Sequence, residues 1–423
     1  MPGRCSFSRG IGGGCPAMRE RDTDVLVIGA GPAGATAART AAAKSARVIL
    51  LERKECVGVL VRCGEASSMV DLKPFIEGVD MGEVHPITGF LSHAPDGTSV
   101  RLDNEMTRAF QTVVLDRAIF DARLAEQAVA AGAELWTEAD AFEPLYNDTR
   151  LVGARVRRGR EIVDVKAGMT IAADGIESRV GRWAGLKTLL HPRDFSSCYT
   201  MVLDNIESDD NLLHFYWGRD VAPGGYGWMF PRSDGGGNLG VGITETGSDR
   251  GQARKYLLDL KARWFPDAKT RREAAGALPL AYPLKRIWAD NLLLTGDAAR
   301  LCDPLTGGGI PQALVSGREA GRLAAEALHA ENTGETYLSR YAGRLEKEIL
   351  KPHRTHYRFR NAIGAVSDKM LNGAARRING ISMEERTIPG IAKAMFYFDP
   401  RLIPEFIKMG RDLLISSGSI GRS

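Results

Sequence analysis

The sequence lacks long apolar runs and is poor in cysteine. No uninterrupted apolar stretch of the 423 residues approaches the roughly 18 that a membrane-spanning helix requires. Hydrophobic residues make up 44% and charged residues 26% of the chain, which argues against disordered or fibrous architecture. No CxxC pair occurs, so neither a disulfide scaffold nor a zinc or iron–sulfur site is indicated, and we expect a reducing, cytoplasmic location. The six cysteines are Cys5, Cys15, Cys56, Cys63, Cys198 and Cys302.

The chain also lacks the dense basic stripe of a nucleic-acid-binding protein. Residues 331–423 hold 16 Lys and Arg against 10 Asp and Glu, whereas the other 330 residues hold 40 against 42. This basic segment either faces an anionic lipid surface or phosphorylated ligand, or is an ordinary solvated face. Residues 1–17 are rich in Gly and Arg without an apolar core, so they are no signal peptide. We expect a disordered extension or a mistaken start, with Met18 as the natural first residue.

A glycine-rich turn between two apolar runs is the strongest local pattern. Residues 24–28 (DVLVI) form a short run typical of a buried parallel strand, and GAGPAG follows at 29–34. An alanine-rich helix is expected up to residue 43, and a second apolar strand over 47–51 ends at Glu52. This order of strand, glycines, helix, strand and acid predicts a dinucleotide-binding unit.

Each position of the turn has a physical role. Gly29 permits the tight turn, Gly31 lets the backbone approach a pyrophosphate, and Gly34 lets helix and strand pack closely. The phosphates would then lie at a helix N-terminus. Glu52 is suited to accept hydrogen bonds from the ribose hydroxyls, which disfavours a 2′-phosphate and leaves FAD or NAD.

Three later segments favour FAD. Residues 113–117 precede an amphipathic helix over 118–128, residues 169–175 (MTIAADG) form a strand that ends in an Asp-Gly turn, and residues 291–299 (NLLLTGDAA) form a buried strand that ends in Gly-Asp. A helix after that last strand could receive phosphate or the flavin pyrimidine. A separate NAD domain would need a second glycine fingerprint, and the chain has none.

Three motifs resemble those of the geranylgeranyl reductase family: VRCGEA at 61–66, PGGYGWMFP at 223–231, and GDAA…PLTGGGI within 296–310. The second matches the family's PxxYxWxFP signature. The resemblance extends from about residue 24 to at least residue 328. It implies an α/β protein with a glutathione-reductase-type, p-hydroxybenzoate-hydroxylase-like FAD domain, an inserted antiparallel-sheet substrate domain and a helical C-terminal cap.

The segments assigned to these parts are discontinuous. The FAD-binding domain is expected to comprise residues 18–85, 110–190 and 286–328. The substrate domain is expected to comprise residues 86–109 and 191–285, and the helical C-terminal region residues 329–423.

Within the family, the chain resembles the archaeal digeranylgeranylglycerophospholipid reductases. The resemblance implies saturation of isoprenoid double bonds in membrane ether lipids, by hydride transfer from N5 of reduced FAD and protonation of the other carbon. The alternatives are a chlorophyll- or geranylgeranyl-diphosphate-type reductase, an aromatic-ring flavin monooxygenase and a non-enzymatic electron carrier. The external electron donor is ferredoxin, a reduced deazaflavin or NAD(P)H. We expect a prenylated glycerophospholipid substrate, no nucleic acid, and a cytoplasmic protein peripheral to the inner face of the membrane.

The resemblance also implies site residues, and no metal ligands. The expected cofactor contacts are Gly29, Gly31, Ala33, Gly34, Glu52, Cys63, Gly64, Ala66, Arg117, Ala141, Asp297, Gly309 and Ile310. Cys63 is also the candidate catalytic residue, as a proton donor or redox sensor, and a Cys63–Cys302 disulfide is considered for the oxidised enzyme. The candidate substrate contacts on the aromatic strand are Tyr226, Trp228 and Phe230, with ordinary cross-strand packing as the alternative. The concentrated positive charge at 351–360 adds His353 and Arg354 as candidates for a headgroup phosphate, with a solvated helix face as the alternative.

The end of the chain contains one more pattern. Phe406, Ile407, Met409, Leu413 and Leu414 form an apolar stripe that is too short to span a bilayer. It either lies on a membrane surface or docks on the body of the protein.

Overall fold

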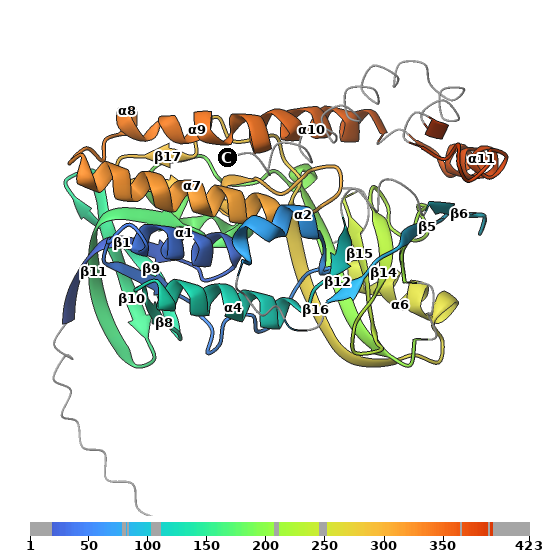
Figure 1. Ribbon diagram of the computed structural model, residues 1–423, viewed down its shortest axis with the longest axis horizontal. Helices are drawn as coiled ribbons and strands as arrows, with labels where there is room; N and C mark the ends of the chain where they lie inside the picture. The colour runs from blue at the N-terminus through green and yellow to red at the C-terminus, as the bar shows by residue number, and fades with distance from the viewer. Residues whose placement is uncertain are drawn as a thin grey trace, which may run out of the picture.

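Two large β-sheets and the helices that cover them organise the chain (Figure 1). The computed structural model describes residues 19–391, apart from 78–81, 83, 103–110, 207–210, 245–251, 364–365 and 388–389. Met18 and the apolar stripe expected around residues 406–414 lie outside this range.

The first sheet has eight strands and contains the glycine-rich turn. Its main path runs β17-β18-β11-β1-β2-β8, and the β9–β10 hairpin continues from β11. The strands are β1 (Arg19–Ile28), β2 (Val48–Leu51), β8 (Glu134–Trp136), β9 (Ala139–Asn147), β10 (Arg150–Arg158), β11 (Glu161–Ala172), β17 (Trp288–Ala289) and β18 (Leu292–Leu294). Strands β18, β11, β1, β2 and β8 are parallel to one another. The predicted buried strands are thereby confirmed, because apolar side chains at every position suit a sheet covered on both faces.

Helices α1 (Pro32–Ala42), α4 (Arg117–Ala130) and α7 (Ile310–His329) pack beside this sheet. Alanines on α1 and glycines on α7 bring these two helices very close together. A Cβ at Gly317 would lie 2.2 Å from the carbonyl oxygen of Ala33, and a Cβ at Gly321 2.3 Å from that of Ala37. The amphipathic helix expected at 118–128 is α4, and its predicted apolar face is buried.

The second sheet has seven strands in the order β16-β12-β15-β14-β13-β5-β6. They are β5 (Gly89–His93), β6 (Ser99–Leu102), β12 (Phe195–Asp204), β13 (Leu212–Tyr216), β14 (Tyr226–Pro231), β15 (Gly237–Ile243) and β16 (Lys269–Pro279). Neighbouring strands are antiparallel as predicted, except that β5 and β13 pair in parallel. This exception arises because the β5–β6 hairpin comes from a distant part of the sequence and joins the edge beside β13. Helix α6 (Ala253–Trp264) covers one face of the sheet.

A small sheet and two short helices complete the central part of the chain. The strands β3 (Ala66–Ser68), β7 (Thr112–Val114) and β4 (His85–Pro86) form an antiparallel sheet in the order β3-β7-β4. The helices are α2 (Met69–Leu72) and α5 (Arg179–Trp183).

The C-terminal helices run along one edge of the molecule, from the first sheet towards the second (Figure 1). They are α8 (Glu335–Leu338), α9 (Arg340–Leu345), α10 (Lys351–Ile363) and α11 (Asp368–Asn379). A π-helical turn over residues 346–350 precedes Pro352, which has no amide hydrogen to continue the regular helical pattern. In the described part of the chain, no helix is both long and apolar enough to cross a membrane.

Candidate functional site

The turn between β1 and α1 leaves a helix N-terminus open to a cleft. Gly29 has a φ of +106°, and a Cβ there would lie 2.3 Å from the carbonyl oxygen of Ala173. A Cβ at Gly34 would lie 1.8 Å from the carbonyl oxygen of Gly29. At Gly31 no atom lies within 4 Å of a built Cβ, and the first amides of α1 receive no side-chain cap. Gly29 and Gly34 therefore shape the turn, while Gly31 keeps space free in front of it.

The acid at the end of β2 closes the turn from the other side. One carboxylate oxygen of Glu52 accepts from the amide of Ala30 at 3.3 Å, and the other accepts from the amide of Lys54 at 3.0 Å. Glu52 therefore lies beside the glycine turn, at the position that the sequence predicted for a ribose contact.

A cleft with about 1120 Å³ of empty space, part of it open to solvent, extends from this turn. Eight of the predicted cofactor residues line it, and they come from four separate segments of the chain. They are Gly31, Ala33, Glu52, Cys63, Arg117, Asp297, Gly309 and Ile310.

The other predicted cofactor residues lie behind the lining or away from it. A Cβ at Gly64 would lie 3.0 Å from the Phe230 ring, so Gly64 allows contact with the aromatic strand β14. Ala66 lies in β3 against the same aromatic cluster. Ala141 is buried in β9, and its carbonyl accepts a hydrogen bond from Arg179 at 2.5 Å. The structure thus gives these residues packing contacts, and Ala141 is not part of the cleft wall.

A thiol and an ion pair lie side by side in the cleft. The Cys63 sulfur accepts from the amide of Glu65 at 3.2 Å, and Arg117 forms two 2.8 Å bonds with Asp121. Burial raises the pKa of the Cys63 thiol, although the neighbouring Arg117 works in the opposite direction. Cys63 is therefore a protonated thiol at neutral pH. Cys63 and Cys302 both line the cleft and both are free, so the disulfide considered from the sequence is not formed.

Glu65, Arg232 and Asn238 form a buried polar network that the sequence analysis missed. Glu65 is only 1% exposed and is ion-paired with Arg232. It also accepts from the Asn238 amide at 2.9 Å and from the backbone amide of Arg117 at 3.1 Å. The same Asn238 amide donates to the Cys63 carbonyl at 2.8 Å. The network thereby joins the cysteine loop to the second sheet.

The aromatic strand presents its alternate side chains to the cleft loops. Tyr226, Trp228 and Phe230 share one face of β14, with ring centroids 6.0 and 6.2 Å apart. The Tyr226 hydroxyl donates to the carbonyl of Thr306 in the loop that borders the cleft. On β13, Phe215 joins this face, with its ring centroid 5.6 Å from that of Tyr226. Tyr216 lies on the other face, where it stacks on His93 and contacts Trp264.

The structure does not support the two expected headgroup contacts. His353 is 3% exposed on α10, and its Nε2 bonds the carbonyl of Ala281 at 2.9 Å. Burial lowers the pKa of His353, which favours its neutral form. Arg354 forms an ion pair with Glu346. The sequence of the basic segment at 351–360 does not reveal which side of its helix is buried. In the structure, the side with His353 and Arg360 packs against residues 280–281.

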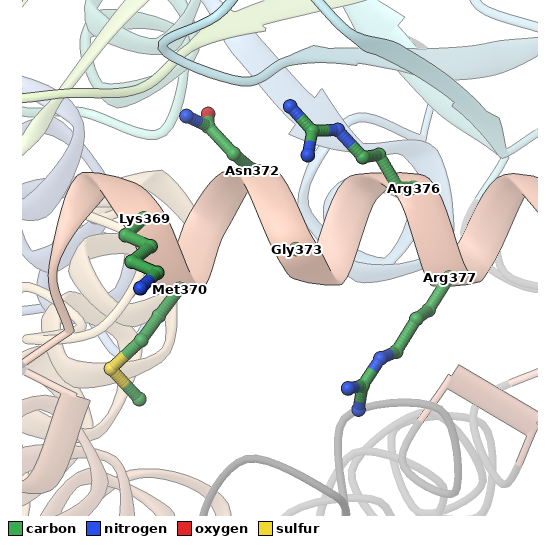
Figure 2. Close-up of a pocket in the computed structure, with 6 residues that line it drawn as sticks. All are labelled: Lys369, Met370, Asn372, Gly373, Arg376 and Arg377. Carbon is green, nitrogen blue, oxygen red and sulfur yellow. The ribbon is translucent and has the colours of Figure 1, made fainter.

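A second cavity lies along α11, and it shares no lining residue with the cleft (Figure 2). Asn372 and Arg376 point to one side of the helix, where they contact Asp96 of the β5–β6 turn at 3.1 and 2.6 Å. Met370 and Arg377 point to the other side. These contacts hold α11 on the second sheet. No residue predicted from the sequence as functional lines this cavity.

Comparisons with known proteins agree with this arrangement. The model of FAD-dependent oxidoreductases matches residues 24–222, and that of the geranylgeranyl reductase catalytic domain matches residues 194–276. Digeranylgeranylglycerophospholipid reductases of Methanocella arvoryzae and Methanothrix thermoacetophila are 34% and 35% identical to this chain. The alignments cover 91% and 90% of this chain, and 98% of each relative.

Solved structures with a similar fold include a related reductase-like protein and a more distant flavoprotein. A geranylgeranyl bacteriochlorophyll reductase-like protein from Thermoplasma acidophilum has a TM-score of 0.84 and 30% identity, over 92% of this chain and 100% of its own. The flavin-dependent halogenase CmlS, at 20% identity, shares the fold with a TM-score of 0.64, over 94% of this chain and 78% of its own.

The glycine turn, the cleft and these matches define an FAD-dependent oxidoreductase, so the predicted cofactor and fold class are confirmed. The chain belongs to the geranylgeranyl reductase family, and it is a flavin-dependent reductase.

The cleft residues fit FAD. The space before Gly31 and the uncapped N-terminus of α1 suit a pyrophosphate, because free amides and the helix dipole attract anions. Helix α7 also begins at the cleft without a side-chain cap, after Gly309. Asp297 precedes it as a partly buried carboxyl in the cleft lining, under the influence of the Arg117 charge, so it can accept from ribityl hydroxyls.

FAD affinity is expected to rise with pH through the titration of Asp297. Burial raises the pKa of this carboxyl to about 6 in the free cleft. Hydroxyl donors favour its ionised form, so bound FAD lowers that pKa and binding strengthens as protons are lost. Between pH 5 and 7 the dissociation constant should fall about tenfold in wild type and stay nearly flat in Asp297→Asn. Flavin fluorescence titration measures both; equal pH profiles would contradict the assignment.

Proposed function

We propose that the protein saturates the isoprenoid double bonds of digeranylgeranylglycerophospholipids in membrane lipid biosynthesis. The observation that carries this proposal is the junction between the cleft and an aromatic sheet face. Tyr226 bonds the cleft loop at Thr306, and Gly64 lets the cysteine loop pack on Trp228 and Phe230. A prenyl chain needs an apolar surface of this kind next to the flavin. The names of the relatives in Methanocella and Methanothrix supply the substrate class.

The protein's own residues have separable roles in this reaction. Bound FAD, once reduced by the external electron donor, would supply the hydride. The N-termini of α1 and α7, together with Glu52 and Asp297, would hold the cofactor. An isolated alkene has no carbonyl to stabilise charge, so the site must exclude water and keep a weak acid within reach. We propose Cys63 as the proton donor, because its side chain lines the cleft and its thiol stays protonated at neutral pH. A Cys63→Ala variant with normal turnover would exclude this role.

Phe215→Ala is expected to weaken use of the prenyl substrate. Phe215 is partly exposed on the aromatic face, in contact with Tyr226 and Phe230. Losing a phenyl contact with a prenyl chain should lower kcat/KM at least about tenfold, chiefly through KM. Tyr216→Phe, one residue away on the opposite face, is the control and should leave kcat/KM unchanged. Equal effects of the two variants would contradict the assignment of the substrate to this face.

A reductase of the chlorophyll type is the second candidate, favoured by the Thermoplasma structure at 30% identity. Parallel assays with the ether phospholipid and with geranylgeranyl diphosphate distinguish the two. The electron donor is a ferredoxin, a reduced deazaflavin or NAD(P)H, and anaerobic flavin reduction by each in turn identifies it.

We also propose a cytoplasmic protein that contacts the membrane peripherally. The excess of cations in residues 331–423 supports this, and Lys351 and Arg358 are exposed on α10. Sedimentation with anionic but not zwitterionic vesicles tests it. The two large sheets support the proposed division into an FAD domain and a substrate domain at the expected boundaries.

A further inference from the structure

The loop over residues 302–309 forms one wall of the flavin cleft through Cys302, Gly307 and Gly309. Asp303 fixes its shape. One oxygen of this carboxylate accepts from the amides of Leu305 and Thr306, each at 2.9 Å, and from the Thr306 hydroxyl at 3.1 Å. The Asp303 backbone adds bonds of 2.7 Å to the Gly308 carbonyl and 2.9 Å from the Gly307 amide.

The other oxygen of Asp303 bonds Nδ1 of His356 on α10, 53 residues later in the chain. Asp303 is 8% exposed and His356 6%. Burial works to raise the pKa of Asp303, but the bond and charge of His356, together with the Thr306 amide and the charge of His353, hold that pKa below its usual value. The carboxylate is therefore ionised, which makes it a strong acceptor for the loop amides.

Two other contacts fix α10 to the segment that follows β16. Nε2 of His353 and the guanidinium of Arg360 bond the carbonyls of Ala281 and Leu280, each at 2.9 Å. On the opposite side of the loop, Tyr226 of β14 bonds the Thr306 carbonyl. The cleft loop is thus held from the C-terminal helices by His356 and from the substrate sheet by Tyr226.

We propose that His356 is a positioning residue of the flavin site, which acts through Asp303 to hold the 302–309 loop against bound FAD. The C-terminal helix α10 accordingly contributes to FAD binding, because it carries His356. The proposal concerns FAD binding, so it stands or falls independently of which prenyl substrate the enzyme reduces.

Three single variants test this proposal in the full-length protein. His356→Phe keeps the ring volume but cannot bond Asp303, whereas His356→Asn keeps a donor close to the Nδ1 position. His353→Leu is the control, because it removes an equally buried histidine of the same helix that bonds residue 281 and not the loop. The readouts are the dissociation constant for FAD and the visible absorption and circular dichroism bands of the bound flavin.

His356→Phe is expected to raise the FAD dissociation constant about tenfold or more and to shift the flavin bands, since a charge-assisted bond that shapes the site is lost. His356→Asn should stay within about threefold of wild type, and His353→Leu should lose thermal stability without changing the flavin bands. Adding Asp303→Asn to His356→Phe should change FAD affinity little, because the His356 bond is already lost and the Asn amide oxygen can still accept from the loop amides.

The proposal is overturned if His356→Phe and His353→Leu lose stability alike while both bind FAD with the wild-type constant and bands. If His356→Phe does not fold, His356→Leu is measured in its place with the same criteria. Failure of lipid reduction in a variant with normal FAD binding would count against the proposed function instead.

Discussion

Gly31→Val is expected to abolish FAD binding without harming the fold. Its φ of −68° and ψ of −177° suit any L-residue, and no atom lies within 4 Å of a built Cβ. The added side chain would therefore occupy the space in front of α1 that we propose for the pyrophosphate. FAD affinity should fall at least about 100-fold, since the ligand must lose its contacts with the helix N-terminus. Calorimetric titration with FAD measures the effect, and the apoprotein should keep its Tm.

Gly34→Ala is the matched variant with the opposite expectation. Its Cβ would lie 1.8 Å from the Gly29 carbonyl oxygen, so α1 cannot keep its place beside the turn. The apoprotein should itself lose stability. Normal FAD binding by Gly31→Val would contradict the proposed cofactor position, and a Tm loss equal to that of Gly34→Ala would show that Gly31 has a structural role.

Arg232→Met is expected to lower the free energy of unfolding by about 3–5 kcal/mol, because it leaves a buried carboxylate without its cation. The Arg232 side chain is 9% exposed and the Glu65 side chain 0%. Asn238 and the backbone of Arg117 would still bond Glu65, but no positive charge would replace the guanidinium beside it. Urea unfolding of the apoprotein measures the loss.

Arg271→Met is the control for this prediction. Arg271 forms comparable ion pairs with Asp204 and Asp234, but its side chain is 45% exposed. Exposed pairs contribute about 0–1 kcal/mol, so this variant should be nearly neutral. The double variant Glu65→Gln with Arg232→Met should recover part of the loss, because no charge is then buried alone. Similar losses in Arg232→Met and Arg271→Met would contradict the account of the network.

The sequence predicted those parts of the fold and site that local patterns encode. The runs at 24–28, 47–51 and 291–295 are apolar at nearly every position, which only a sheet buried on both faces explains. The glycine turn and Glu52 lie within 30 residues of each other in the sequence, so a local pattern is enough to predict the dinucleotide-binding unit. Asp297 was found because it ends a second buried strand, and Gly309 was found through the resemblance to the geranylgeranyl reductase family.

Contacts between distant segments were not predictable in this way. Glu65 meets Arg232 across 167 residues, and Asp303 meets His356 across 53, with no spacing that marks either pair. The only signal for Glu65 in the sequence was its position inside the family motif at 61–66. On α10 the error concerned orientation: His353 and His356 are both buried, and only the tertiary packing shows which groups they bond.

The most direct test of the account is an anaerobic single-turnover experiment. The flavin of the holoenzyme is reduced with dithionite, digeranylgeranylglycerophospholipid is added, and flavin absorbance and lipid mass are followed together. We expect flavin reoxidation coupled to a stepwise gain of hydrogen by the lipid, two atoms for each double bond. A flavin that stays reduced until air is admitted, with unchanged lipid, would contradict the proposed reductase and favour a monooxygenase or an electron carrier.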